Sequence, residues 1–229
     1  MGYLEDNGIK AVCFDIDGTF YPLKETNMRV FRASILHLPF ALRYNKARQT
    51  SRTEDSHLDK PVMSAEEISR RMAKAIYGND DDLTIRKYER KVKKVFHEKY
   101  EKYFLSVKPY EGVVECLGEL KKRGYPMGVL SDFPVGTKLS AMGIEDYFCV
   151  KVSSEDIGRY KPCRTPFRVL AERLDVKPQE ILYMGDSQRK DIEGAKGAGM
   201  HTVLLTNDKS SSTADITVSS WKELYERLF

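Results

Sequence analysis

The chain has 229 residues, of which 41% are hydrophobic and 31% charged, and its formal net charge is +4 at pH 7. This length and balance are typical of a folded protein with one large domain, or with a core and a smaller second domain. The sequence has no apolar run near the roughly 18 residues of a membrane span and begins with an acidic segment unlike a secretory signal, so we expect a cytoplasmic protein that does not bind membranes.

The first predicted strand, residues 9–14, ends at a pair of aspartates, Asp15 and Asp17, which Gly18 and Thr19 follow. In a parallel sheet both carboxylates would emerge at the carboxyl end of the strand, where open α/β sheets bind their ligands. Two carboxylates beside a dry core repel each other and lose solvation. The pair therefore predicts a nearby positive group, and a divalent cation is the first candidate.

Residues 25–104 show no convincing strand pattern and predict a small all-helical insert. The expected helices cover residues 29–44, with a kink or break at Pro39; residues 64–77, beginning at Ser64; and residues 84–104, with a charged outer face. A polar loop is expected over residues 45–60.

The net charge of this helical region also differs from that of the rest of the chain. Residues 24–108 contain 20 basic and 12 acidic residues, a net charge of +8, and the remainder of the chain carries −4. A basic insert above an acidic core would favour anionic substrates, although most of these cations are expected to be simply solvent-exposed. No nucleic-acid-binding motif accompanies the charge, so no nucleic-acid partner is expected.

The rest of the chain alternates between strands and helices. Further strands are predicted over residues 126–130, 149–152, 181–184 and 202–205, and helices over 112–123, 165–174 with Thr165 as its cap, 191–198, and after Ser220. This alternation predicts an α/β fold with a parallel sheet that helices cover on both faces. The four cysteines, Cys13, Cys116, Cys149 and Cys163, form no CxxC pair and are predicted to be free thiols.

Three further polar signals follow strands or lie in loops. Ser131 and Asp132 come directly after the strand at 126–130, and Lys161 lies in a loop that Pro162 keeps from being helical. The strand at 181–184 leads into Gly185-Asp186-Ser187, with Asp191 five residues beyond Asp186. These residues supply a hydroxyl, a cation and more carboxylates at strand ends.

Together these four motifs, in this order, resemble those of haloacid dehalogenase superfamily hydrolases, and the resemblance covers residues 9–24 and 105–229. It implies a Rossmann-like catalytic core built from residues 1–24 and 105–229. Residues 25–104 would be a helical cap domain inserted between the first and second motifs, as in the first cap class of the superfamily. Such a cap closes over the site, excludes water and selects the substrate.

The resemblance also implies roles for residues of this sequence. Asp15 would be the catalytic nucleophile and Asp17 the general acid and base, and Lys161 would act in catalysis and hold the substrate phosphate. Mg²⁺ would bind to the carboxylates of Asp15 and Asp186 and to the backbone carbonyl of Asp17.

Other motif residues are expected to support these groups. Asp191 and Ser187 would support the metal site without binding the ion directly. Ser131 and Asp132 would lie at the substrate phosphate, although Asp132 stands where the superfamily often has Asn. Its carboxylate would either face the substrate or bind the loop that follows it.

The function that these roles imply is a Mg²⁺-dependent phosphatase that hydrolyses a small phosphorylated metabolite through an aspartyl-phosphate intermediate. Asp17 argues against dehalogenation, because haloacid dehalogenases lack this residue. A phosphomutase of the same superfamily and a catalytically inactive binding protein with this fold are the alternatives. Neither the natural substrate nor the oligomeric state follows from the sequence.

Two groups of residues bear on specificity. Phe20 and Tyr21 are expected either to stack on a ring of the substrate, such as a nucleobase, or to pack against the cap helices. Four cap residues are expected either to bind a second anionic group or to remain solvated: Arg43, Lys46, Arg48 and Arg52.

Overall fold

The computed structural model describes residues 2–23, 37–56, 58–97, 107–208 and 210–229. Six parallel strands form one sheet in the order β3-β2-β1-β4-β5-β6. The strands are β1 (Ala11–Phe14), β2 (Met127–Ser131), β3 (Val150–Ser153), β4 (Ile181–Gly185), β5 (His201–Leu205) and β6 (Ile216–Val218). This is the Rossmann strand order, in which the direction of winding reverses between β1 and β4. The predicted α/β fold is therefore confirmed.

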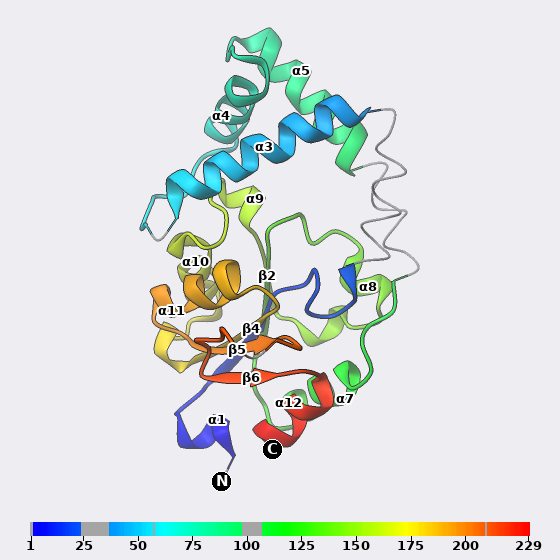
Figure 1. Ribbon diagram of the computed structural model, residues 1–229, viewed down its shortest axis with the longest axis vertical. Coiled ribbons are helices and arrows are strands. Elements are labelled where there is room, and N and C mark those ends of the chain that lie inside the picture. Colours follow the sequence, from blue (N-terminus) through cyan, green and yellow to red (C-terminus); the bar gives the residue numbers. More distant parts are fainter. Residues whose placement is uncertain (1, 24–36, 57, 98–106, 209) are drawn as a thin grey trace.

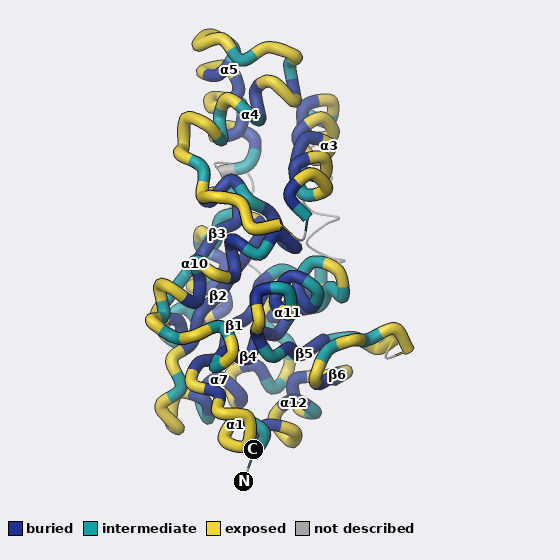
Figure 2. Tube along the Cα trace, turned by 90° about the vertical axis from the view of Figure 1, so that its left-hand side faces the viewer, coloured by how far each residue is buried: buried dark blue, intermediate teal, exposed yellow. Residues whose placement is uncertain are grey.

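Helices cover both faces of the sheet (Figure 1). The alternating side chains of β1 show the two faces: Val12 and Phe14 belong to one apolar cluster, whereas Ala11 and Cys13 belong to the other. The first cluster lies under α1 (Tyr3–Asp6), α7 (Val113–Lys122) and α12 (Trp221–Leu228), and the second under α10 (Arg164–Leu174) and α11 (Gly194–Ala198). Figure 2 shows the strands as a buried layer inside the core.

An aromatic stack supports the loop that follows β1. The Trp221 ring stacks on Phe14 and Phe20, with centroid separations of 5.5 and 5.4 Å. Trp221 Nε1 also donates a hydrogen bond to the Thr19 carbonyl oxygen at 2.9 Å. Phe20 is fully buried in this cluster. The expectation that Phe20 stacks on a substrate ring is wrong, because its ring is buried in the core beneath the loop, and the described members of its cluster include no residue of the helical insert.

The insert between β1 and β2 is helical in its described residues and lies above the core in Figure 1. It consists of α3 (Leu38–Asp55), α4 (Ala65–Tyr77), α5 (Asp82–Val92) and a π-helical turn, Lys93–His97. These helices share an apolar cluster of their own that includes Phe40, Tyr44, Met72, Ile76 and Tyr88. The two predicted domain junctions, 24/25 and 104/105, lie outside the described residues, and so do parts of the helices expected over 29–44 and 84–104.

One expectation for the insert is wrong and another is not tested. Pro39 lies in the first turn of α3, where its missing N–H costs nothing, and the residues before it on which the predicted kink or break depends lie outside the described ranges. Residues 45–55 are helix and not a polar loop. The apolar pattern failed there because the buried positions of this part of α3 include Arg48, Ser51 and Asp55, of which Arg48 and Asp55 bind groups on other elements. By contrast, Ser64 caps α4 as expected, through a hydrogen bond from the Glu67 N–H.

Several core details also differ from expectation. Thr165 does not cap α10, which begins at Arg164; its hydroxyl instead donates to the carbonyl oxygen of Lys60. The helix expected over 191–198 starts earlier, as a π-helical turn over Gln188–Glu193 that leads into α11. Ser220 caps α12 as expected.

Short helical turns complete the core: α8 (Lys138–Ala141), Glu145–Tyr147, α9 (Ser154–Ile157) and Pro178–Glu180. All four cysteines are free thiols, as predicted. Within the described ranges, no helix combines the length and apolar character needed to cross a membrane.

Candidate active site

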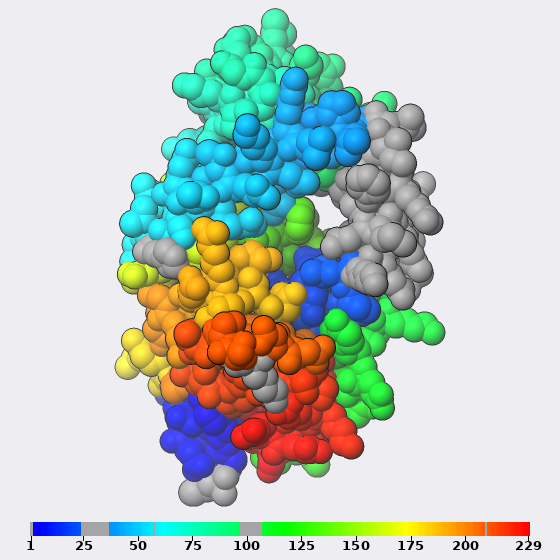
Figure 3. All heavy atoms as spheres, in the orientation of Figure 1, coloured from blue at the N-terminus to red at the C-terminus, as the bar shows by residue number. Residues whose placement is uncertain are grey.

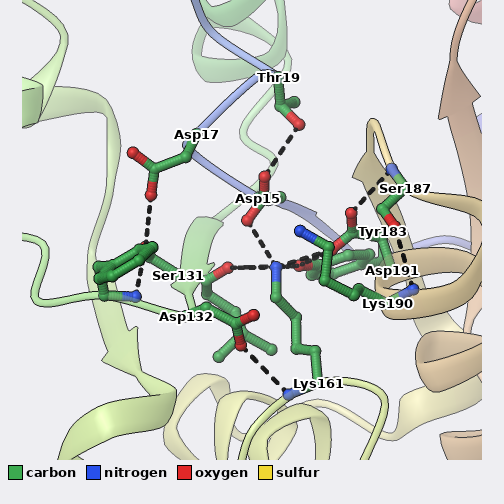
Figure 4. A network of polar contacts seen from close by, with 12 residues as sticks. Asp15, Asp17, Thr19, Ser131, Asp132, Lys161, Tyr183, Ser187, Lys190 and Asp191 are labelled. Atoms are coloured by element: carbon green, nitrogen blue, oxygen red, sulfur yellow. Dashed lines mark hydrogen bonds and ion pairs between the residues drawn. The ribbon is translucent and has the colours of Figure 1, made fainter. Parts of the chain in front are cut away.

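Lys161 lies at the centre of a buried polar network at the carboxyl ends of β1, β2 and β4 (Figure 4). Its ammonium nitrogen lies 2.5 Å from an Asp15 oxygen and 2.7 Å from an Asp191 oxygen. The Tyr183 hydroxyl accepts a further hydrogen bond from it. Burial alone would lower the pKa of Lys161, but the charges of Asp15 and Asp191 raise it well above its ordinary value. The lysine therefore stays charged and offsets two buried carboxylates.

Asp15 leaves the end of β1 and is nearly fully buried. Its second oxygen accepts a hydrogen bond from the Thr19 hydroxyl at 3.3 Å. Burial raises the pKa of its carboxyl, and the charge of Lys161 opposes this shift. Three other carboxylates, those of Asp191, Asp17 and Asp186, raise it further. This carboxylate cluster holds more negative charge than Lys161 alone compensates.

Asp17 is held separately from Asp15. Its carboxylate oxygens accept hydrogen bonds from Lys138 at 2.7 and 2.8 Å, from Ser131 at 3.0 Å, and from the Tyr21 hydroxyl. Burial acts to raise the pKa of Asp17, but the charge of Lys138 and the hydrogen bonds from Lys138, Tyr21 and Ser131 lower it overall. Asp17 is therefore an anion here. The Tyr21 hydroxyl donates to this carboxylate. Neither expectation for Tyr21, stacking on a substrate ring or packing against the cap helices, is confirmed.

Three carboxylates are close enough to share a cation. Oxygens of Asp15, Asp186 and Asp191 lie within 4.8 Å of one another. Burial, followed by the charge of Asp191, raises the pKa of Asp186 to about 6. Its Oδ1 atom is buried and has no hydrogen-bond partner among the described residues. A buried carboxylate oxygen without a donor is costly, and a hard divalent cation with oxygen ligands would satisfy it. The residues present thus fit a Mg²⁺ ion.

The supporting motif residues are placed as follows. Asp191 uses both oxygens inside the protein, one for Lys161 and the other for the Ser187 N–H at 3.0 Å. The Ser187 hydroxyl accepts from the Lys190 N–H and caps the turn that follows. The Ser131 hydroxyl accepts from the Phe133 N–H in addition to its bond with Asp17. The structure therefore brings all four motifs together.

Asp132 differs from the other motif residues. One of its oxygens accepts from the Lys161 N–H at 3.2 Å, and the other binds the Arg52 guanidinium at 2.7 Å. Burial acts to raise the pKa of Asp132, but the charges of Lys161, Arg52 and Arg48 lower it overall. With both oxygens occupied by donors of the protein, Asp132 connects the core to the helical insert, which is closer to its expected loop-binding role than to a role in phosphate binding.

A cavity of about 260 Å³ opens beside these groups, between the core and α3. It is lined by Asp15, Asp17, Asp132, Phe133, Lys161 and Lys190 from the core, and by Asn45, Arg48, Gln49 and Arg52 from α3. In the space-filling view α3 lies directly above the core segments that follow β4 (Figure 3). Of the four cap cations singled out from the sequence, Arg48 and Arg52 reach the site, whereas Arg43 and Lys46 are exposed.

The sequence did not point to four other residues of this site. Lys138 lies on a short helix with no motif around it, and Lys190 lies among the unspecified positions of the fourth motif, between Ser187 and Asp191. Thr19 appeared only as part of a turn. Tyr183 could have been found, because a hydroxyl inside an otherwise apolar, fully buried strand needs a polar partner.

Comparison with known proteins agrees with this geometry. Residues 9–199 match the model of the haloacid dehalogenase-like hydrolase family. A phosphoglycolate phosphatase of Escherichia coli (strain K12) is 30% identical, with 90% of this chain and 84% of the relative covered. A glyceraldehyde 3-phosphate phosphatase of Methanopyrus kandleri is 32% identical, with 88% and 85% covered. Among solved structures, a HAD phosphatase from Thermococcus onnurineus superposes with a TM-score of 0.61 at 26% identity, covering 95% of this chain and 97% of that one.

The chain therefore belongs to the haloacid dehalogenase-like hydrolase family. Within that family it is a phosphatase-type hydrolase, as its relatives and its complete set of motif residues indicate.

Proposed function

We propose that the protein hydrolyses phosphate monoesters of small metabolites in a Mg²⁺-dependent reaction that passes through an aspartyl-phosphate on Asp15. The observation that carries this proposal is the pairing of Asp15 with Lys161 at the cavity floor, with the separately held Asp17 two residues away. Phosphate monoesters hydrolyse extremely slowly in water, so the site must lower the barrier by on the order of 20 kcal/mol.

In the first step an Asp15 oxygen attacks phosphorus, and the bond between phosphorus and the leaving oxygen breaks. Asp17, having bound a proton, gives it to that leaving oxygen, so that an alcohol departs. In the second step the ionised Asp17 takes a proton from a water molecule, which attacks phosphorus and releases inorganic phosphate from Asp15. The donors around Asp17 stabilise the ionised form that this second step requires.

The remaining residues bind and orient. Lys161 would hold a transferring phosphoryl oxygen as well as Asp15, and Ser131 would add a hydroxyl donor when it turns from Asp17. Asp15, Asp186 and the Asp17 carbonyl would hold Mg²⁺, with Asp191 and Ser187 fixing the surroundings. When bound, the ion supplies positive charge that offsets the phosphoryl oxygens and the carboxylate cluster. Asp132 is left out of phosphate binding, because its oxygens are already used and its charge would repel the substrate.

The size of the cavity and the relatives support a small substrate. A space of about 260 Å³ suits a leaving group of a few carbon atoms. Two relatives are phosphatases of phosphoglycolate and of glyceraldehyde 3-phosphate. We therefore expect short-chain phosphates to be hydrolysed faster than nucleoside monophosphates in a phosphate-release screen across both classes. Isomerised substrate in place of free phosphate would instead identify a phosphomutase.

Removal of the metal is expected to abolish activity. A chelator should lower the rate of phosphate release by at least about 100-fold, and Mg²⁺ should restore it, because the ion offsets charge in the transition state. Asp186→Asn should raise the Mg²⁺ concentration for half-maximal activity by at least about tenfold, since even indirect partners of a metal site cost that much. Titration of activity with Mg²⁺ measures both effects.

The matched control for this metal experiment is Asp208→Asn, because Asp208 is an exposed carboxylate that accepts hydrogen bonds from Ser210, far from the motif residues in sequence. It should leave the Mg²⁺ titration unchanged. Activity that persists after chelation would refute the metal-dependent proposal.

Gly18 offers a test of the backbone geometry around Asp186. Gly18 has φ +99°, and a Cβ added there would lie 2.2 Å from Asp186 Oδ2. Gly8 has φ +65° with no atom within 4 Å of an added Cβ. Both Gly→Ala variants should lose about 1 kcal/mol of unfolding free energy from backbone strain. Only Gly18→Ala should also lose activity, by at least about tenfold, because it displaces a carboxylate of the site.

Urea unfolding and the phosphate-release assay distinguish the two effects of the glycine variants. Equal activity in Gly8→Ala and Gly18→Ala would contradict the proposed importance of Asp186.

A further inference from the structure

Side chains on one face of the cap helix α3 bind the loop that carries Lys161. Arg48, Arg52 and Asp55 are spaced by four and three residues, so they lie along one side of the helix. Each of them contacts the core, and two of their partners, Arg159 and Lys161, lie in the loop before α10. This face explains why a polar stretch of sequence forms a helix with one buried side.

Arg52 holds the backbone of Lys161 directly. Its Nε donates to the Lys161 carbonyl oxygen at 2.9 Å, and its Nη2 binds Asp132 at 2.7 Å. Asp132 in turn accepts from the Lys161 N–H at 3.2 Å. The two peptide groups that flank the Lys161 Cα are therefore held by one ion pair, whose members come from the cap and from the end of β2.

Neighbouring contacts fix this ion pair in place. Arg48 Nη2 donates to the Asp132 carbonyl oxygen at 2.6 Å, and its guanidinium lies 3.8 Å from the centre of the Phe133 ring and 4.8 Å from that of Tyr160. One loop position before Tyr160, the Arg159 guanidinium binds Asp55 at 3.0 Å. The loop is thus held at three consecutive residues by α3 and by Asp132.

The position of the Lys161 backbone matters because its ammonium lies at the end of a flexible four-carbon stem. That group must reach both Asp15 and Asp191 inside a buried site. A displacement of about 1 Å at a catalytic group can cost on the order of 100-fold in rate. Without Arg52, the Lys161 backbone would keep the contact of its N–H with Asp132 but lose the donor to its carbonyl oxygen.

We propose that Arg52 and Asp132 are positioning residues that fix Lys161, so that docking of α3 onto the core completes the catalytic site. The inference rests on the proposed function, in which Lys161 acts on the transferring phosphoryl group. The cap then does more than enclose the substrate. Lys161 reaches its catalytic position only when α3 is docked on the core.

Arg52 also lines the cavity, so direct substrate contact is the competing explanation. The two explanations differ in what they predict for different substrates. A residue that touches the leaving group affects some substrates more than others. A residue that positions Lys161 affects all of them equally, because Lys161 acts on the phosphoryl group that every substrate shares.

The experiment compares Arg52→Gln, Asp132→Asn and the double variant on an aryl phosphate, a phosphorylated hydroxy acid and a sugar phosphate. We expect kcat to fall about 10- to 100-fold in each single variant, by the same factor on all three substrates. The double variant should be no worse than the poorer single variant, because both changes break one linkage. Inorganic phosphate, titrated calorimetrically, should bind the single variants more weakly than the wild type.

Controls make the outcomes distinct. Arg43→Gln and Lys46→Gln remove exposed cations from the same helix and should change nothing. Asp132→Asn keeps the side-chain shape and an oxygen for the Lys161 N–H, so it tests the charge without a cavity. Losses that vary with the leaving group, losses that multiply in the double variant, or unchanged kcat would each overturn the inference. An inactive wild type would instead overturn the proposed function.

Discussion

Asp15→Asn is expected to lower the rate of Mg²⁺-dependent phosphate release by at least about 10⁴-fold, the scale of loss when an enzyme is deprived of its nucleophile. An amide in this position cannot form the aspartyl-phosphate. The variant should still fold, because Lys161 keeps its 2.7 Å ion pair with Asp191 and because one member of a crowded carboxylate cluster has lost its charge.

The control for this variant is its neighbour. Asp17→Asn keeps the nucleophile but removes both the acid of the first step and the base of the second. With an aryl phosphate, whose leaving group departs without a proton, the first step should still proceed and phosphate should accumulate on Asp15. Rapid quenching with labelled substrate should therefore trap phosphoprotein in Asp17→Asn and none in Asp15→Asn. A rate for Asp15→Asn within about tenfold of the wild type would rule out Asp15 as the nucleophile.

Lys161→Met is expected to damage stability as well as catalysis. It leaves Asp15 and Asp191 buried without their cation, and breaking a buried ion pair from one side costs on the order of 3 kcal/mol of unfolding free energy. The rate should fall by about 10³-fold, because a fixed positive donor to the transferring phosphoryl group is lost. Urea unfolding in the presence of a chelator measures the first effect without a metal ion that could replace the lysine charge.

The stability deficit of Lys161→Met should depend on pH. A buried carboxyl without a cation has a higher pKa in the folded than in the unfolded state, so the folded protein loses stability as the pH rises through that pKa. The deficit should therefore be largest at alkaline pH and shrink as the pH falls through the pKa of Asp15, which burial raises to about 8 even beside Lys161 and which the loss of that lysine should raise further. Lys10→Met provides the contrast, because its 2.6 Å ion pair with Glu180 is exposed. A deficit that stays constant with pH would show that lost packing, and not unpaired charge, destabilises the variant.

The core could be predicted from the sequence because apolar runs and strand-end motifs are local signals. The runs at residues 9–14, 126–130 and 181–184 predicted β1, β2 and β4 to within two residues at each end. Ile216–Val218 was missed as β6, because three residues with a threonine in the middle carry too little pattern. The predicted site residues lie close together because the carboxyl ends of parallel strands meet at one edge of a sheet. They are Asp15, Lys161, Asp186 and Asp191.

The sequence did not reveal which residues connect the helical insert to the core. The contacts of Arg48 and Arg52 with the core connect residues about 80 to 109 positions apart, and no local pattern distinguishes them from Arg43, which is exposed. Lys138 and Asp17 are 121 positions apart. In the sequence, polar side chains that are buried against another part of the chain cannot be distinguished from those on the solvent-exposed face of a helix. Prediction therefore failed for buried polar residues that lie outside the four motifs.

The Trp221 contact has a consequence for the order in which the protein matures. Trp221 donates to the Thr19 carbonyl and stacks on Phe14 and Phe20, so the loop that presents the nucleophile is supported by a residue 202 positions downstream. During synthesis this loop is therefore made long before the residue that supports it, and we expect the loop to reach its folded shape only after Trp221 has been added.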